Sequence, residues 1–260
     1  MMPLRTHFLP LLLLFALQLF LNGCSVVSKE TFDSTRSSQD WLAEANPEAL
    51  DVLHFWFEEW DRDIELRGAG RYNEKWFPHG PNGAAGSQEV DRLTREKFLP
   101  IFESVVSGKH DWNTYRNPFE NLAYIILIDQ FSRNMFRNQG RAFYYDALAR
   151  DAAKVNLEKQ FYEHYFTGYQ KLFVIFPMMH HEHLASQQIA LDYLKALNEH
   201  SDHPYEFLNA LNKGFEHYQM VYMFGRFPHR NQAKQRMPTE LEDAYLSKKG
   251  TKGFIDGARW

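Results

Sequence analysis

The spacing of apolar residues predicts helices along most of the chain. Apolar side chains recur every three or four positions between residues 90 and 105, and there is no sustained alternation of apolar and polar residues. Residues 122–128 are apolar on nearly every side of a helix, which predicts a central helix there. Two later stretches mark one helix face each, formed by Leu184, Leu191 and Leu194, and by Leu208, Leu211, Phe215, Tyr218 and Tyr222. The pattern predicts an all-α domain built from antiparallel helix pairs.

Three short sequences have the composition of helix N-termini, at residues 46–48, 117–120 and 239–242. The first two place Asn at the N-cap, Pro at the first helical position and an acidic residue in the first turn. The third pairs Thr with a Glu three residues later, which predicts a capping box. Glu120 is expected to close a similar box at the start of the second helix.

Proline and glycine predict the interruptions between helices. Pro100 is expected to kink one helix and Pro177 to break another, because proline removes a backbone donor and clashes with the preceding turn. Gly108 and Gly225 are expected at helix C-termini, where the left-handed conformation favours glycine. Residues 62–86 are rich in glycine and irregular, which predicts a long loop or insertion.

The first residues have the layout of a bacterial export signal. Arg5 precedes an apolar run over residues 8–20 that is too short to span a bilayer comfortably. The run ends in Leu-Asn-Gly-Cys, and Cys24 is the only cysteine in the chain. This ending resembles the lipobox of bacterial lipoproteins, in which the cysteine is acylated and becomes the mature N-terminus. It predicts a signal peptide over residues 1–23 and lipid on Cys24; the alternative is a membrane-anchored signal with an incidental cysteine.

The remaining chain divides into three expected parts. Residues 24–44 contain many Ser, Thr and Asp residues and are expected to form a lipid-anchored flexible tether. One α-helical domain is expected over residues 45–250, followed by a C-terminal tail over residues 251–260. The lipid would make the membrane a partner, with the domain facing the periplasm. Ser25 stands where Asp would favour retention in the inner membrane, so the outer membrane is the expected destination.

Composition narrows the classes of function. Of the 260 residues, 44% are hydrophobic, 16% aromatic and 24% charged, as in a globular protein rather than a disordered one. The formal net charge of −4 gives no reason to expect a nucleic-acid partner. A single cysteine excludes a disulfide framework and a thiolate-rich metal site. The motifs of nucleotide-binding loops, zinc proteases and serine hydrolases do not occur, and no cofactor is predicted.

Asp129 and Arg133 lie one helical turn apart at the end of the most apolar helix, in the order that favours an ion pair. With Asn134 they form a polar group that emerges from a core helix. One interpretation is structural: a buried helix end whose charges pair with each other and with Asn134. The other is functional, because a partly desolvated arginine binds carboxylates and phosphates well.

The sequence His180-His181-Glu182-His183 offers a second group of candidates. If this segment is helical, His180 and His183 share one face. A metal site would draw on His180, Glu182 and His229. The alternative is that His180 is a hydrogen-bonded core histidine and that His181 and His183 face solvent.

A third group follows the expected helix end at Gly225, where Arg226, His229 and Arg230 form a compact basic loop interrupted by Pro228. These side chains either cap the exposed carbonyls of the preceding helix or form an anion clamp. In the clamp, an arginine would bind the anion with two hydrogen bonds and His229 would exchange protons.

Five sequence blocks appear in an order shared with a known bacterial family. They are LHFWF at residues 53–57, WF at residues 76–77, LAYIILIDQFSRN at residues 122–134, FPMMHHE at residues 176–182 and GRFPHRN at residues 225–231. Over residues 48–247 the chain resembles the bacterial domain-of-unknown-function 924 family. The resemblance implies a tetratricopeptide-like α-α superhelix and no particular activity. The loop at residues 62–86 and the leader depart from the usual family pattern.

The helical domain is therefore expected to bind a small anionic ligand or a peptide in a groove lined by Arg and His. The candidate ligand-binding residues are Asp129, Arg133, Asn134, His180, Glu182, Arg226, His229 and Arg230. All of them except Asn134 are expected to converge from three segments. If the histidines carry charge at low pH, anion affinity should weaken as the pH rises through the histidine range. Two alternatives remain: a hydrolase, with or without a metal, that uses the His, Glu and Asp side chains, and a protein–protein scaffold.

Overall fold

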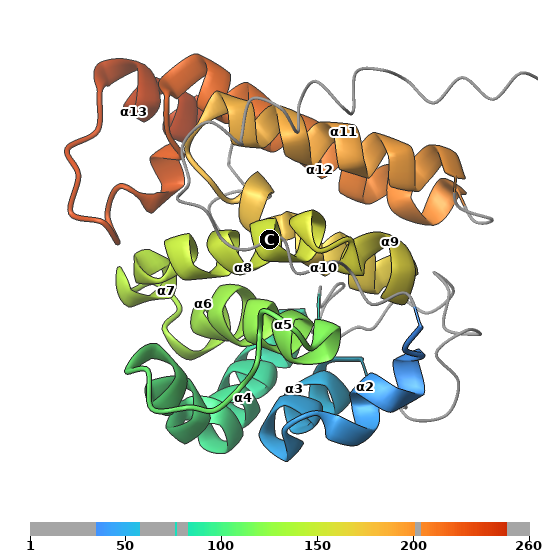
Figure 1. The fold of residues 1–260 in the computed structure, drawn as a ribbon. Helices are drawn as coiled ribbons and strands as arrows, with labels where there is room; N and C mark the ends of the chain where they lie inside the picture. The colour runs from blue at the N-terminus through green and yellow to red at the C-terminus, as the bar shows by residue number, and fades with distance from the viewer. Residues whose placement is uncertain (1–34, 58–75, 77–82, 201–203, 249–260) are drawn as a thin grey trace, which may run out of the picture. The chain divides into compact units, whose positions relative to one another are not determined.

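The regular elements of the protein, seen in a computed structural model, are all helices within the described residues, 35–57, 76, 83–200 and 204–248 (Figure 1). In chain order they are α2 (Ser38–Glu44), α3 (Pro47–Phe57), α4 (Gly83–Val106), α5 (Pro118–Ile125), η2 (Ile126–Phe131), α6 (Ser132–Met135), α7 (Arg141–Tyr144), α8 (Asp146–Glu158), α9 (Phe161–Tyr165), α10 (Gly168–Met179), α11 (Leu184–His200), α12 (Pro204–Phe224), η3 (Pro228–Arg230) and α13 (Glu240–Lys248). The all-α fold predicted from the sequence is confirmed.

Consecutive long helices pack on one another. α10 packs on α11 and α11 packs along α12, and the two helices of the latter pair lie side by side in Figure 1. Because the connections between these helices are short, neighbours run antiparallel, as predicted. α5 occupies the middle of the domain, where it contacts α3, α8 and α10.

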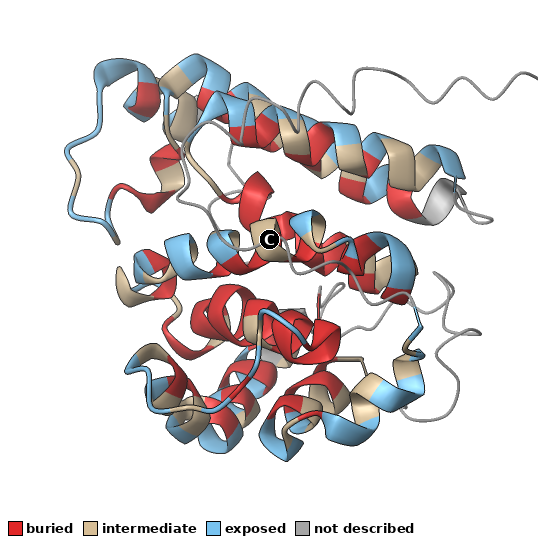
Figure 2. Ribbon diagram, viewed as in Figure 1, coloured by how far each residue is buried: buried red, intermediate tan, exposed pale blue. Residues whose placement is uncertain are grey.

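The core lies around α5 and η2. Every side chain from Pro118 to Phe131 is buried except Tyr124, which confirms the predicted central helix (Figure 2). Aromatic rings fill the space between this helix and its neighbours: Trp56 of α3 makes edge-to-face contacts with Phe131 at 5.4 Å and with Phe173 at 5.5 Å. Each such pair contributes about 0.5–1.5 kcal/mol beyond the burial of its area.

The predicted helix ends are found where their local sequences placed them. α3 begins at Pro47, and α5 begins at Pro118 with the Asn117 side chain accepting hydrogen bonds from the first turn. The capping box at the start of α13 is complete, because the Thr239 amide donates to the Glu242 carboxylate at 2.6 Å and the Glu242 amide donates to Thr239 Oγ1 at 3.2 Å. Gly225 has a φ of 69°, as expected of a left-handed residue that ends a helix.

Two local predictions were wrong. Glu120 does not close a box; its carboxylate accepts from the Asn46 amide at 2.8 Å and from the Asn113 amide, and so joins the starts of two helices. Helix α10 continues through Pro177, where a break was predicted. Helix α4 also continues through Pro100, and the kink expected there stays a prediction. Buried side chains on both sides of each proline hold these helices in place, and this packing outweighs the lost backbone hydrogen bond.

The predicted flexible tether needs correction at its C-terminal end, where Ser38–Glu44 forms α2. Trp41 fixes this helix to the domain: its indole Nε1 donates to Tyr165 Oη at 3.0 Å and its carbonyl accepts from Asn117 Nδ2 at 2.9 Å. Similarly, the long loop predicted to end at residue 86 ends earlier, because α4 begins at Gly83.

Several predictions concern residues outside the described part of the chain. These are the signal peptide over residues 1–23, the lipid on Cys24, the first part of the tether and the tail over residues 251–260. Among the helices that are described, none combines the length and apolar character needed to cross a membrane.

Helix α12 buries a different face from the one that the apolar spacing marks. The buried positions include Phe207, Ala210, His217 and Val221. The predicted apolar face (Leu208, Leu211, Phe215, Tyr218 and Tyr222) instead contains three exposed side chains and two that are partly buried. α12 thus has apolar residues on both its inner and its outer face.

Candidate functional site

The candidate site forms where the central helix changes its geometry. Between α5 and α6, residues Ile126–Phe131 form the π-helix η2, which contains Asp129. A π-helical turn shifts the backbone hydrogen-bond partners by one residue, and such turns are frequent at functional sites. The Asp129 carbonyl here accepts from Ser132 Oγ at 3.2 Å and from the Arg133 guanidinium. Side chains thus satisfy the backbone at the position that carries the buried carboxylate.

The Asp129 carboxylate is fully buried and receives three donors. His180 Nδ1 lies 2.9 Å from both oxygens, Gln130 Nε2 donates to Oδ2 at 2.6 Å, and Arg133 Nη1 lies 3.0 Å from Oδ1. Burial alone would raise the pKa of Asp129, but the Arg133 charge and the hydrogen bonds outweigh it, so the pKa lies below its ordinary value. Asp129 is therefore ionised at neutral pH.

His180 ends α10 and is fixed by this carboxylate. Because Asp129 is an acceptor, we assign the imidazole proton to Nδ1, which leaves Nε2 as a hydrogen-bond acceptor. Nε2 is buried and has no hydrogen-bond partner among the described residues. Burial and the Arg133 charge lower the pKa of His180 despite the opposing effect of Asp129. At neutral pH the ring is uncharged and oriented.

Asp146, at the start of α8, connects two buried arginines. Its Oδ1 lies 3.1 Å from Arg133 Nη2 and its Oδ2 lies 3.3 Å from Arg230 Nη1. Arg230 Nη1 also donates to the His180 carbonyl at 3.0 Å. Asp129, Arg133, Asp146, His180 and Arg230 therefore form one connected group, which we call the buried cluster.

The local backbone explains how Arg230 reaches this cluster. Gly225 ends α12 with its positive φ, and Phe227 continues in an extended conformation before Pro228 starts the short helix η3. Phe227 is fully buried and anchors the turn. The Arg230 guanidinium then lies against two rings, 4.6 Å from the Phe143 centroid and 4.5 Å from the Phe227 centroid.

The two arginines of the buried cluster differ in how well their charges are compensated. Burial lowers the pKa of both, but Arg133 lies next to Asp129 and Asp146, which together raise its pKa above the ordinary value. For Arg230 burial dominates, and its pKa falls to about 10, because Asp146 is its one close carboxylate and Arg133 repels it. Arg230 is the less compensated cation.

Two more histidines lie near the cluster. His217 of α12 has its ring centroid 6.1 Å from that of His180, and its Nδ1 donates to the Lys213 carbonyl at 2.8 Å. Burial lowers the pKa of His217 to about 3 and the pKa of His229 well below its ordinary value. The pKa of His180 is lowered as well, so all three shifts favour the neutral imidazole. The expected fall of anion affinity through the histidine range stays a prediction.

A second group of charged residues, which we call the outer layer, consists of Glu182, Lys234 and Arg236. The Arg236 guanidinium pairs with Glu182 through bonds of 2.7 and 2.9 Å, and Lys234 Nζ lies 3.9 Å from the same carboxylate. Glu182 also accepts from the Phe227 amide at 2.8 Å, which fixes the turn that carries Arg230. Burial raises the pKa of Glu182, but Arg236 and this amide lower it overall.

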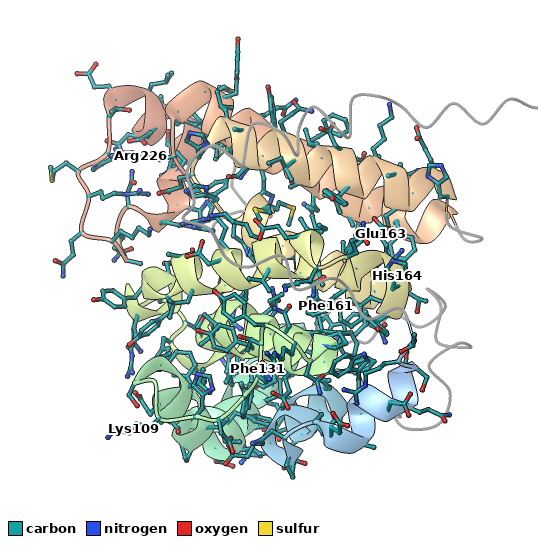
Figure 3. The ribbon with its side chains drawn as sticks, in the orientation of Figure 1. Lys109, Phe131, Phe161, Glu163, His164 and Arg226 are labelled. Carbon is teal, nitrogen blue, oxygen red and sulfur yellow. The ribbon has the colours of Figure 1, made fainter. Side chains whose placement is uncertain are left out.

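The structure brings together some of the predicted site residues and separates others. Asp129, Arg133, His180 and Arg230 are in contact, and Glu182 and His229 lie beside them. Arg226 does not join: its guanidinium pairs with Glu242 of α13 at 2.6 and 2.7 Å, and Figure 3 shows it near that helix.

Asn134 also lies outside the cluster. Its side-chain amide donates to Asp91 of α4 at 2.9 Å, and Asp91 is paired with Arg137. Its prediction as a ligand-binding residue is corrected accordingly, because its polar group is used to hold α6 on α4.

One interpretation assumed that the segment from His180 to His183 is helical, but the structure shows that it is not. It forms the turn between α10 and α11, in which His181 Nδ1 lies 2.7 Å from Ser186 Oγ and the His181 and His183 rings stack with centroids 5.6 Å apart. His180 and His183 therefore do not share a helix face. Only His180 points into the buried cluster.

Sequence reasoning missed three charged residues: Asp146, Lys234 and Arg236. Asp146 stands in the first turn of α8, where an acidic residue is adequately explained by the helix dipole. Lys234 and Arg236 follow the basic loop in an irregular segment with no motif of its own. The signal that could have found Lys234 and Arg236 was the total positive charge of residues 226–236, which is larger than that of the basic loop alone.

The donor set does not favour a metal ion. Within the described ranges, no group of three or more His, Cys, Asp or Glu side chains is arranged to hold one. Of the three ligands considered from the sequence, Glu182 is occupied by Arg236 and the Phe227 amide. The predicted alternative of His180, Glu182 and His229 as metal ligands is therefore not supported by the geometry.

The fold and the buried cluster together define an all-α domain organised around paired arginines, a carboxylate-bound histidine and an acidic bridge. The chain belongs to the family described as bacterial protein of unknown function (DUF924), whose model matches residues 52–250. It is also similar to the solved structure of a protein of unknown function from Agrobacterium tumefaciens, with 26% identity and a TM-score of 0.62 over 77% of this chain and 97% of that one. No curated protein matches the chain.

Proposed function

We propose that the domain binds a small anion, a carboxylate or a phosphate, next to Arg230. The observation that carries the proposal is the state of this side chain, which is 2% exposed and has one carboxylate at 3.3 Å. Its Nε has no hydrogen-bond partner among the described residues, and burial lowers its pKa. A buried guanidinium in this state gains more from an anion than a solvated one, because charge-assisted hydrogen bonds strengthen where water is excluded.

The charges around Arg230 support an anionic ligand. The buried cluster and the outer layer contain four cationic side chains: Arg133, Arg230, Lys234 and Arg236. They contain three carboxylates, those of Asp129, Asp146 and Glu182. With the neighbouring histidines neutral, one positive charge is in excess, and a monovalent anion would compensate it.

Lys234 indicates the side from which the anion would approach. Its side chain is 31% exposed, and its Nζ lies 6.0 Å from the Phe143 ring against which Arg230 also rests. Burial together with Arg230 and Arg236 lowers the pKa of Lys234 despite the opposing carboxylates. An anion between Lys234 and Arg230 would relieve the repulsion between them.

Thermal unfolding of the full chain in phosphate, acetate or chloride at constant ionic strength tests the proposal. Phosphate or acetate is expected to raise the unfolding midpoint along a saturable curve, because a ligand of the native state stabilises it by mass action. Lys234→Gln should weaken the apparent affinity about tenfold, as expected for one charged hydrogen bond.

Arg226→Gln is the matched control, because Arg226 belongs to the same sequence block but pairs with Glu242. Its anion response should equal that of the unaltered chain. General salt effects stabilise all variants alike and do not saturate. An identical, unsaturable response in the unaltered chain, Lys234→Gln and Arg226→Gln would refute an anion site next to Arg230.

One observation favours a second candidate, a hydrolase. His180 is held by Asp129 through Nδ1, and its unprotonated Nε2 is left without a partner among the described residues. This is the arrangement of a general base, in which the carboxylate orients the ring and stabilises the imidazolium that forms. In such a reaction Nε2 would remove a proton from water as the water oxygen attacks an ester held by Arg230. The bond to the alcohol oxygen would then break, and the imidazolium would return the proton to the departing alcohol.

Hydrolysis of chromogenic carboxylate and phosphate half-esters would test this candidate. His180→Gln should lower the rate about 100-fold or more, while His181→Gln, which alters the adjacent histidine on Ser186, should not. Absence of hydrolysis by the unaltered chain, or equal rates in both variants, would count against it.

We further propose that the chain is a lipoprotein of the bacterial cell envelope, anchored through Cys24 and facing the periplasm from the outer membrane. The proposal is supported by the export-signal layout and by the position of the chain's single cysteine. Metabolic labelling with a fatty acid tests it, since label should enter the unaltered chain and not Cys24→Ala.

A further inference from the structure

The outer face of α12 has an apolar stripe that other described residues leave uncovered. Its members, which we call the α12 stripe, are Leu208, Leu211, Phe215, Tyr218 and Tyr222. Leu208 is 42% exposed, Phe215 48% and Tyr222 70%, and the other two are partly buried. Figure 2 shows buried and exposed bands alternating along this helix. Single exposed apolar residues need no explanation, but a continuous row does.

The spacing of the row is that of a helix-pairing surface. Its successive members are separated by three, four, three and four residues, which is the heptad spacing of a coiled-coil seam. The inner face of α12 already packs on α11, where Gly214 allows Leu191 and Leu194 to approach closely. The stripe is therefore a second seam on a helix whose first seam is filled. In arrays of stacked helix pairs, an outermost face is normally polar unless something packs on it.

We propose that the α12 stripe is the interface of a homodimer in which the α12 helices of two copies pack antiparallel across a two-fold axis at Phe215. The stripe is nearly symmetric in sequence about this residue: Leu208 and Tyr222 stand seven residues from it, and Leu211 and Tyr218 stand four and three residues from it. An antiparallel pair therefore places Leu208 against the partner's Tyr222, and it brings Leu211 within one residue of the position opposite the partner's Tyr218. Each tyrosine lies beside a smaller leucine, Phe215 meets the same residue of the partner at the axis, and every member finds a partner.

The charges beside the stripe are compatible with a second copy of the same chain. Its exposed border includes the neutral side chains of Asn212, Gln219 and Met223, and the antiparallel arrangement places Gln219 near the partner's Asn212. Lys213 and Glu216 are paired with each other at 2.9 Å. Two identical surfaces usually repel when they carry net charge, and with Lys213 and Glu216 paired this border has no net charge. A partner selected by charge would require a charged border.

Sedimentation velocity of the full chain over a dilution series tests the dimer. The unaltered chain should sediment as a dimer that dissociates on dilution. Phe215→Glu places two like charges at the two-fold axis and should raise the dimer dissociation constant at least about 30-fold, the effect expected for a central interface residue. Asn209→Glu is the matched control, because it adds the same charge at an exposed position on the far edge of α12. Circular dichroism of both variants should show unchanged helix content.

Disulfide trapping tests the antiparallel arrangement in versions whose single cysteine is replaced by Cys24→Ser. A mixture of Leu208→Cys and Tyr222→Cys chains should form crosslinked mixed dimers on oxidation, and neither chain alone should crosslink efficiently. A chain that is monomeric at every concentration, or a dimer that Phe215→Glu does not weaken, would overturn the proposal. Efficient self-crosslinking of Leu208→Cys would overturn the antiparallel two-fold pairing.

Discussion

His217 gives the sharpest quantitative prediction, which concerns the pH dependence of stability, because it is a neutral histidine buried near the cationic Arg230. It is 4% exposed, and its Nδ1 donates to the Lys213 carbonyl at 2.8 Å. Burial is the main cause that lowers its pKa to about 3, with further contributions from His180 and Arg230. In the unfolded chain its pKa is about 6.5. As the pH falls below 6.5, the unfolded state therefore binds a proton that the folded state rejects.

The sign and size of the effect follow from proton linkage. A histidine with a lowered pKa contributes its full stability above the unfolded pKa and loses it as the pH falls towards the folded pKa. Between pH 7 and pH 5, His217 alone should cost about 2 kcal/mol of unfolding free energy, at 1.36 kcal/mol per pH unit below 6.5. His180 and His229 have pKa values lowered in the same direction and add to the loss. This is a large part of the 5–15 kcal/mol that is typical of a domain.

Urea unfolding followed by circular dichroism at pH 7, 6 and 5 measures the effect. The difference in unfolding free energy between pH 7 and pH 5 should be about 2 kcal/mol smaller in His217→Gln than in the unaltered chain, whatever the stability of that variant at pH 7. His200→Gln, which alters an exposed histidine at the end of α11, is the control and should leave the difference unchanged. Equal pH dependence in the unaltered chain and His217→Gln would show that His217 is not a buried neutral group.

Three further predictions concern single positions. Asp129→Asn should lower the unfolding free energy by about 3–5 kcal/mol in chemical denaturation, because it leaves Arg133 buried with less compensation. The control Glu103→Gln should lower it by under about 1 kcal/mol, because the Glu103–Arg141 pair is exposed. Gly140→Ala should lower the unfolding free energy by about 1–3 kcal/mol in the same measurement, because the added Cβ would lie 2.6 Å from the Ala233 carbonyl oxygen. Gln139→Ala, at the exposed neighbouring position, should not lower the unfolding free energy in this way. Cys24→Ala should move the chain from the membrane fraction to the soluble fraction on cell fractionation, and continued membrane attachment would contradict lipidation.

The sequence predicted the ends of several helices well, because these depend on interactions between residues close together in the chain. Asn117, Thr239 and Gly225 act through backbone groups within four residues, so their roles do not depend on distant contacts. Pro177 shows the limit of this reasoning. Its local effect is to break a helix, but the packing of α10 in the core is stronger.

The candidate site shows the same division. Asp129 and Arg133 are four residues apart, and their ion pair follows from helix geometry. Arg226 and Arg230 are also four residues apart, yet one pairs with Glu242 of α13 and the other enters the buried cluster. The extended conformation of Phe227 is local, because Phe227 precedes Pro228. The acidic partner of Arg226 stands on a later helix, and nothing near the arginines encodes it.

The composition of the buried cluster has a consequence for the order of folding. It joins His180 to Asp129 across 51 positions of the chain and Arg230 to Asp146 across 84. Contacts of such separation form only after the entropy of closing long loops has been lost, so they come late. Until then, each charge remains in water and costs nothing. Once the helices close, a missing member leaves an uncompensated ion in the core, so partly assembled states are penalised. The cluster thereby makes the completion of this domain close to an all-or-none event.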